Sequence, residues 1–182
     1  DLSADFVAAA RGLTRRCGLE DRVSFQRASA LALPFADAAF DAATLIHVGM
    51  NVADKARMFA EMRRVLKPGG RFGVYDIMRT GAGELPYPMP WAVTPETSFV
   101  ETSEVYGRLL RAAGFAIEAE HDRRELTLRL AREMRERIAR EGPPTLSPAV
   151  IAGPAIKERL ANVMSAVERG LIAPIAIIAR AA

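Results

Sequence analysis

Apolar positions along the chain follow two spacings, one typical of helices and one typical of strands. In residues 4–17 they recur on one helical face, occupied by Phe6, Val7, Ala10 and Leu13. Ser3 precedes this segment as a candidate N-cap, and Gly18 follows it where a helix commonly ends. The pattern predicts a capped amphipathic helix at the beginning of the chain.

Five segments have the composition or period of β-strands. Residues 40–48 form a nearly continuous apolar run, which is typical of a parallel strand buried on both faces. The other four predicted strands cover residues 23–27, 71–77, 115–121 and 171–179. Pro174 lies in the last one, and because proline cannot donate to a ladder, we expect it near the strand start or at a bulge.

Helical periods separate these strands. The clearest is residues 54–66, which ends at a Lys67-Pro68-Gly69-Gly70 turn. Its inward positions are Met58, Phe59, Met62, Val65 and Leu66. Three more helices are predicted, over residues 103–113 with Ser103 as cap, residues 125–141 and residues 154–169. The second of these has an apolar stripe of Leu126, Leu130, Met134 and Ile138. The alternation of strands and helices predicts an α/β fold with right-handed crossovers.

Composition indicates one domain. The chain has 182 residues, 50% of them hydrophobic and 26% charged, which excludes a disordered chain. The pI near 9.4 first suggests a nucleic-acid partner. However, the arginines of residues 123–140 alternate with glutamates at i,i+4 spacing, so this helix neutralises itself and we expect no nucleic-acid binding.

Several other classes are also excluded. His47, His121 and Cys17 stand at no metal-ligand spacing, so we expect no metal. No apolar stretch is long enough to cross a membrane, and no secretory leader opens the chain. A single cysteine suits a reducing compartment, so a cytoplasmic location is expected.

Several short sequence motifs together resemble those of the class I S-adenosylmethionine-dependent methyltransferases. Phe40-Asp41 is followed about two dozen residues later by Leu66-Lys67-Pro68-Gly69-Gly70, and residues 103–115 read SEVYGRLLRAAGF. A narrower similarity, to sarcosine and dimethylglycine N-methyltransferases, is carried by residues 87–92 and 98–99. The resemblance covers essentially the whole chain.

The resemblance implies a Rossmann-like, doubly wound sheet of order 3-2-1-4-5-7-6 with strand 7 antiparallel. It implies a single domain over residues 1–182, with residues 78–98 and 122–153 as substrate caps or lids. The proline-rich segment 78–98 has no period, as expected for a loop of this kind.

The cofactor implied by the resemblance is S-adenosyl-L-methionine. Asp1 takes the place of the carboxylate that binds both ribose hydroxyls, and Leu2 would pack on the adenine. Ser29 and Ala30 stand where the family reads the adenine amino group, although the family commonly has Asp at the position of Ser29. The end of the fourth family strand, which lines the methionine portion of the cofactor, falls at Leu45 and Ile46.

Candidate catalytic and substrate residues each have two interpretations. His47 is a general base or a hydrogen-bonded core histidine, and its strand position favours the core. Asn51 positions the acceptor or belongs to a turn. Tyr75 and Asp76 end a strand and could reach the substrate. Tyr87 and Trp91 form an aromatic wall for a methylated ammonium or anchor their loop.

One part of the family pattern does not occur in the chain. The glycine-rich loop after strand 1 should stand roughly twenty residues before Asp1, and strand 1 belongs to the middle of the sheet. We therefore expect these residues to be part of a longer polypeptide, and this segment alone to be inactive.

The sequence thus predicts methyl transfer to a small-molecule acceptor, including an amine as one candidate. It leaves two alternatives open, a non-catalytic methyltransferase-like module and an NAD(P)-dependent oxidoreductase. The expected partner is a small molecule, with neither nucleic acid nor membrane, and a homodimer is left open.

Overall fold

The computed structural model describes residues 1–147, 150 and 153–182, and its centre is a four-stranded sheet. The strands are β1 (Phe40–Ile46), β2 (Leu66–Arg79), β3 (Phe115–Asp122) and β4 (Ile172–Ala181). Their order is β1-β2-β4-β3, with β1 parallel to β2 and β4 antiparallel to both neighbours. This order is the 4-5-7-6 part of the predicted sheet, including its antiparallel strand.

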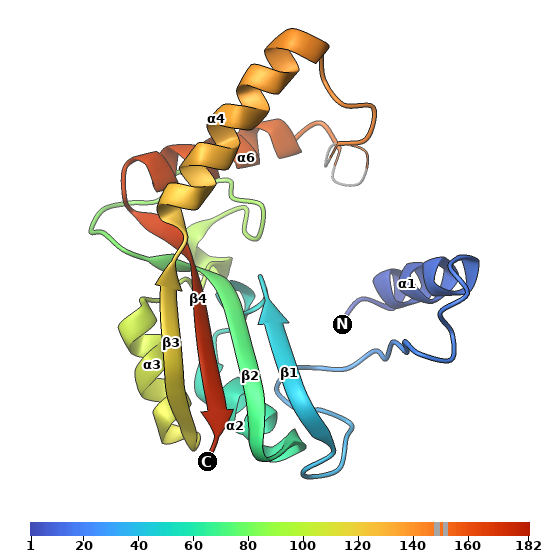
Figure 1. Ribbon diagram of the computed structural model, residues 1–182. Helices are drawn as coiled ribbons and strands as arrows, with labels where there is room; N and C mark the ends of the chain where they lie inside the picture. The colour runs from blue at the N-terminus through green and yellow to red at the C-terminus, as the bar shows by residue number, and fades with distance from the viewer. Residues whose placement is uncertain (148–149, 151–152) are drawn as a thin grey trace.

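Two helices cover one face of this sheet, α2 (Lys55–Val65) and α3 (Ser103–Ala112) (Figure 1). The predicted inward residues of α2 are all buried. Asp54 caps α2, because its carboxylate accepts from Arg57 N at 2.9 Å. The cap of α3 is Thr102, one residue before the predicted Ser103, because the Thr102 hydroxyl accepts from Val105 N.

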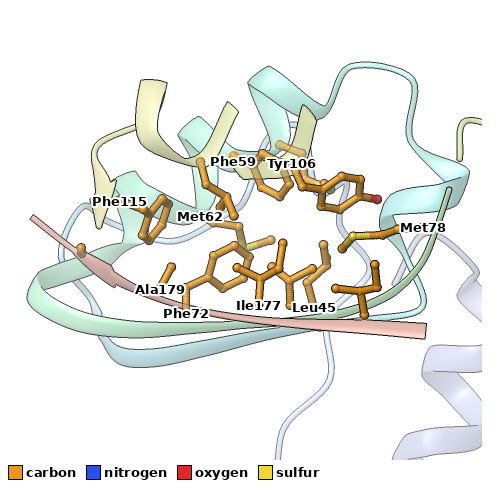
Figure 2. Packing of buried hydrophobic residues seen from close by; sticks show 14 of the residues in the cluster. Leu45, Phe59, Met62, Phe72, Met78, Tyr106, Phe115, Ile177 and Ala179 are labelled. Atoms are coloured by element: carbon orange, nitrogen blue, oxygen red, sulfur yellow. The ribbon is translucent and has the colours of Figure 1, made fainter. Parts of the chain in front are cut away.

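The main core lies between the sheet and these two helices. Figure 2 shows aromatic and aliphatic side chains from both layers meeting there, and the larger ones are fully buried. The labelled residues are Leu45, Phe59, Met62, Phe72, Met78, Tyr106, Phe115, Ile177 and Ala179. This packing fixes the positions at which β1 and β2 end.

Two further helices lie beyond the carboxyl ends of β1 and β2, α4 (Arg124–Glu141) and α6 (Ile156–Glu168) (Figure 1). A second core joins α6, the start of β4 and the segment after β2, which contains the short helix η2 (Pro95–Thr97). Pro174 is the third residue of β4, near the strand start as predicted. The predicted cap over residues 122–153 includes positions 148–149 and 151–152, which lie outside the described residues.

The predicted apolar stripe of α4 is exposed beyond its first member. Leu126 is half-buried, but Leu130, Met134 and Ile138 are exposed. The physical reason is that α4 meets α6 through other positions. Arg124 Nε donates to Val167 O at 2.8 Å, and Leu128, one turn further along, packs against the second core.

The N-terminal helix α1 (Ala4–Arg16) is capped as predicted. Ser3 Oγ accepts from Phe6 N at 3.2 Å, and Gly18 adopts a φ of 64°. In Figure 1 the helix stands apart from β1. Accordingly Phe6 is 63% exposed and Val7 is the one buried residue of this helix.

Two strand predictions near this helix are wrong. Residues 23–27 form no strand. A strand needs a hydrogen-bonded partner along several residues, and within this segment only Arg27 is paired, with Asp1. The strand β1 is not buried on both faces, and Leu45 is its one buried residue. Helices α2 and α3 cover only one face, and among the described strands β1 has a neighbour, β2, on one side.

Candidate functional site

The beginning of the chain lies beside the segment that was predicted as a strand. The Asp1 amino group donates to Gln26 O at 3.2 Å, and Ala28 N donates to Asp1 O at 2.9 Å. These two bonds flank Arg27 in the pattern of a parallel strand pair. Asp1 and Arg27 therefore lie side by side as two paired residues of parallel segments do.

The side chains of Asp1 and Leu2 are open to solvent. Asp1 Oδ1 accepts from Ser3 N at 2.7 Å, which orients the carboxylate at the turn that leads into α1. Leu2 is 68% exposed, and Arg27 Nε holds its backbone by donating to Leu2 O at 3.0 Å. An oriented carboxylate next to an exposed apolar side chain suits a ligand that has hydroxyl groups and a flat ring.

Ser29 and Ala30 lie in a tight turn. Ser29 Oγ accepts from Leu31 N at 3.1 Å, and Ser29 O accepts from Ala32 N at 3.1 Å. The turn is fixed on α2, because Arg57 Nε donates to Leu31 O. The Ser29 hydroxyl thus accepts a bond within its own turn and keeps its proton as a donor.

This turn is also held by a strong ion pair on α2. Glu61 accepts from Leu33 N at 2.8 Å and from Arg64 at 2.8 Å. These bonds lower the pKa of Glu61 to about 2, with the Arg64 hydrogen bond as the largest cause. The segment after Ser29 is therefore attached to the main core, although α1 stands apart from it.

The end of β1 separates its last two side chains. Leu45 points into the main core, whereas Ile46 is 58% exposed. Any contact of Leu45 with the cofactor is therefore restricted to its backbone, as the resemblance implies for this strand.

His47 is not the core histidine that the sequence favoured. It is exposed and lies just past β1 with a φ of 53°. Its backbone N donates to Tyr75 O at 2.9 Å, and its ring stands edge-on to the Tyr75 ring at 5.1 Å between centroids. The reason for the difference is that β1 ends at Ile46, so the chain turns before His47 can enter the core.

Asn51 belongs to the short helix η1 (Gly49–Asn51), directly after His47. Its backbone N donates to Val48 O at 2.9 Å, and its side chain is exposed. Tyr75 is half-buried within β2, opposite Ile46 in the register. The structure thus brings His47 and Tyr75 together, with Asn51 on the adjoining turn.

Asp76 does not reach an exposed substrate, in contrast to what its place after Tyr75 suggested. Successive side chains of a strand point to opposite faces, so Asp76 points inward and is fully buried. Its Oδ2 accepts from the Tyr106 hydroxyl at 2.8 Å. Burial raises the pKa of Asp76, and burial together with the neighbouring carboxylate raises that of Tyr106.

Sequence reasoning missed Lys55 and Tyr106, which lie beside Asp76. Lys55 is 3% exposed, and its ammonium lies 5.7 Å from the centre of the Tyr106 ring. Burial lowers the pKa of Lys55. In the sequence, Tyr106 is one of many apolar-face residues and Lys55 is one of many charged helix residues, so neither carries a local signal.

Tyr87 and Trp91 are both half-buried against the second core. Trp91 Nε1 donates to Ser98 Oγ at 2.9 Å, and Asn162 of α6 donates to Pro88 O at 3.0 Å. These contacts attach the loop that carries both aromatic residues to the second core and to α6.

Residues 1–147, 150 and 153–182 hold no group of three His, Cys, Asp or Glu side chains that could bind a metal ion. None of the described helices has the length and apolar character needed to cross a membrane.

Comparison with known proteins agrees with this geometry. Residues 1–74 match the family model described as a methyltransferase domain. The methyltransferase GfsG of Streptomyces halstedii is 42% identical over 81 residues, which cover 44% of this chain and 29% of that protein. The curated relatives are thus matched over only about a third of their own length or less.

Solved structures match the whole chain. The [4+2]-cyclase SpnF has a TM-score of 0.72 and 30% identity, covering 99% of this chain and 64% of that one. A Galdieria sulphuraria protein assigned to the sarcosine dimethylglycine methyltransferases has a TM-score of 0.78 and 16% identity, with coverages of 99% and 67%. A geranyl diphosphate methyltransferase of the same fold was solved with S-adenosylmethionine bound.

The arrangement of the sheet and its helices is the fold of the class I S-adenosylmethionine-dependent methyltransferases. The match of residues 1–74 to the methyltransferase domain model agrees with this class. The matches favour this class over the dinucleotide-dependent oxidoreductases that the sequence had left open.

Proposed function

We propose that this domain transfers a methyl group from S-adenosylmethionine to a small-molecule acceptor. The observation that supports this most directly is the pair of backbone hydrogen bonds that flank Arg27, because they join Asp1 to this segment in the pattern of a parallel strand pair. Ligands of open α/β sheets bind at the carboxyl ends of the strands.

The proposed cofactor site combines two parts of the chain. The Asp1 carboxylate binds the ribose hydroxyls and Leu2 packs on the adenine. Ser29 accepts a hydrogen bond from the adenine amino group, with Ala30 beside it. The end of β1, at Leu45 and Ile46, lines the methionine portion. The cofactor supplies an activated methyl group on a sulfonium sulfur when it is bound.

The residues of the protein then hold the acceptor and exclude water. Such alignment supplies most of the rate in a reaction whose donor is already activated. In this proposal Asn51 donates a hydrogen bond to the acceptor, Tyr75, Tyr87 and Trp91 line its site, and His47 accepts a proton from it. The cap segments 78–98 and 122–153 close one domain that spans residues 1–182.

The finer proposal is that the acceptor is an amine. A neutral amine already has a free electron pair, so it needs alignment rather than a strong base. This agrees with the site, where Asp76 and Tyr106 are buried and bonded to each other and His47 is the exposed titratable group. The cytoplasmic location and the homodimer stay predictions.

The test uses the polypeptide that carries these residues. Calorimetric titration with S-adenosylhomocysteine and with NADH measures cofactor choice, and we expect binding of the first alone. Labelled S-adenosylmethionine is then offered with primary amines, phenols and hydroxy compounds. Failure to bind S-adenosylhomocysteine at millimolar concentration would favour a non-catalytic module.

A second function has one observation in its favour. SpnF, a [4+2]-cyclase, is 30% identical over 99% of this chain. A cyclase reaction rearranges its substrate without a change in mass, whereas methyl transfer adds one CH₂ unit. Mass spectrometry of the converted acceptor therefore separates the two functions.

A further inference from the structure

A buried polar cluster lies under the turn that carries His47 and Asn51. We define the Asp76 cluster as Gly49, Lys55, Asp76 and Tyr106. The carboxylate comes from β2, the phenol from α3, the ammonium from α2 and the glycine from η1. Four separate elements therefore meet at one point just inside the proposed acceptor site.

The pair formed by Asp76 and Tyr106 leaves no room for a side chain at residue 49. A Cβ added at Gly49 would lie 2.4 Å from Asp76 Oδ2 and 2.4 Å from the Tyr106 hydroxyl. Distances this short are not tolerated between non-bonded atoms. The backbone at Gly49 therefore packs directly against the hydrogen-bonded pair, and the position of the pair determines the position of the turn.

Lys55 attaches the same turn from its other end. Its Nζ donates to Val52 O at 2.8 Å and also to Phe99 O. Phe99 N in turn donates to Met50 O at 2.9 Å. The end of the segment after β2 is thus bound both to the turn and to the first residue of α2.

Helix stability alone does not explain these side chains. A cation at the first position of a helix is disfavoured by the helix dipole, and a buried amine, carboxylate and phenol all lose hydration. Apolar residues of similar volume often stabilise a core as well or better. The Asp76 cluster instead provides directional hydrogen bonds, which hold the backbone of the neighbouring turn in one position.

We propose that Lys55, Asp76 and Tyr106 are positioning residues, which hold residues 47–52 so that Asn51 and His47 meet the acceptor. This proposal rests on the proposed function, because the acceptor site is defined there. The groups that face Asp76 are Tyr106 of α3, Lys55 of α2 and His47 after β1, and Glu101 also acts on Lys55 and Tyr106.

The main test is Tyr106→Phe, which removes one hydroxyl and keeps the ring. We expect kcat to fall about tenfold to a hundredfold, the scale of a small misplacement of reacting groups, with the Kd for S-adenosylhomocysteine unchanged. Amide hydrogen exchange at residues 48–52 should become faster. The matched control is Phe115→Leu, which weakens the same core at its other end and should leave kcat unchanged.

A pair of variants at Asp76 separates geometry from charge. Asp76→Asn keeps an oxygen that accepts from Tyr106, whereas Asp76→Leu removes it. Retention of more activity by Asp76→Asn supports positioning, and equal loss in both variants contradicts it. Lys55→Met, which keeps the stem and loses the donor, should also speed exchange at residues 48–52.

The exchange measurement keeps this proposal separate from the proposed function. If the wild-type protein transfers no methyl group, the proposed function fails, and exchange at residues 48–52 still decides whether the cluster holds the turn. Unchanged exchange in both Tyr106→Phe and Lys55→Met would overturn the positioning role. Equal loss of kcat in Phe115→Leu would overturn it as well, by showing general destabilisation.

Discussion

The two sides of β1 differ in how completely the structure covers their apolar residues. On the side of β2, the sheet packs against α2 and α3, and Phe59 and Phe72 are fully buried (Figure 2). On the other side, α1 stands apart, and Phe6 and Ile46 are largely exposed. Both sides have regular, capped helices. The comparison shows that local signals are enough for a helix, whereas its burial depends on partners elsewhere in the chain.

The largest effect should come from truncating one aromatic side chain on each side. Phe59→Ala leaves a cavity in the main core and should lower the free energy of unfolding by about 3–5 kcal/mol. Phe6→Ala removes the same atoms from an exposed position and should cost below about 0.5 kcal/mol. Urea unfolding followed by circular dichroism measures both. Similar losses would show that α1 is packed against the rest of the protein.

The second prediction concerns binding on the α1 side. Asp1→Ala should weaken S-adenosylhomocysteine binding by about 1.5–3 kcal/mol, because a charge-assisted hydrogen bond to the ligand is lost. Asp5→Ala, in the first turn of α1, serves as the matched control and should leave the affinity unchanged. Calorimetry in the polypeptide that carries these residues is the measurement. An unchanged affinity for Asp1→Ala would place the ribose elsewhere.

A pH titration tests the contact that attaches the segment after Ser29 to α2, in which Glu61 accepts from Leu33 N. The pKa of Glu61 is lowered from 4.5 to about 2 in the folded state, so the ionised form stabilises the protein above pH 4.5. That contribution should be lost as the pH falls from 4.5 towards 2. Glu61→Gln should lack this part of the pH dependence of unfolding. Parallel curves for the two proteins would contradict the assignment.

The smallest expected effect comes from removing the N-cap of α1 or that of α2. Asp54→Ala removes the cap of α2 and should lower the free energy of unfolding by about 1 kcal/mol, since α2 belongs to the main core. Ser3→Ala removes the cap of α1 and should speed amide exchange within α1 while changing global unfolding less. Exchange mass spectrometry together with urea unfolding resolves the two cases. A larger global loss for Ser3→Ala would reverse the comparison.

Short-range pattern predicted more of the fold than of the site. The inward face of α2, its end before Lys67 and the strand order around β4 follow from periodicity or from the family resemblance, and the structure agrees with them. The turn expected at Lys67-Pro68-Gly69-Gly70 is wrong, because these residues belong to β2. The role of Asp1 follows from the family resemblance alone, and it stays a prediction.

Site residues whose role depends on the direction in which the side chain points were harder to predict. His47 was assigned to the core because its apolar neighbours suggested a strand that continues past it. In the structure β1 ends at Ile46, one residue before His47. Asp76 and Tyr75 are adjacent in sequence, yet they point to opposite faces of β2. Lys55 and Tyr106 could not be linked to Asp76, because the contacts join residues 21 to 51 positions apart in the chain.

The sequence by itself determined where most helices and the strands β1, β3 and β4 begin and end to within a few residues, because caps, proline, glycine and apolar period act over one or two turns. It also indicated the methyltransferase class through short words at strand ends. Only the tertiary structure decided which apolar faces are covered and which polar residues meet at Asp76. Burial and hydrogen bonding depend on which distant segments share the same space, and that is set by the packing of the whole sheet and its helices.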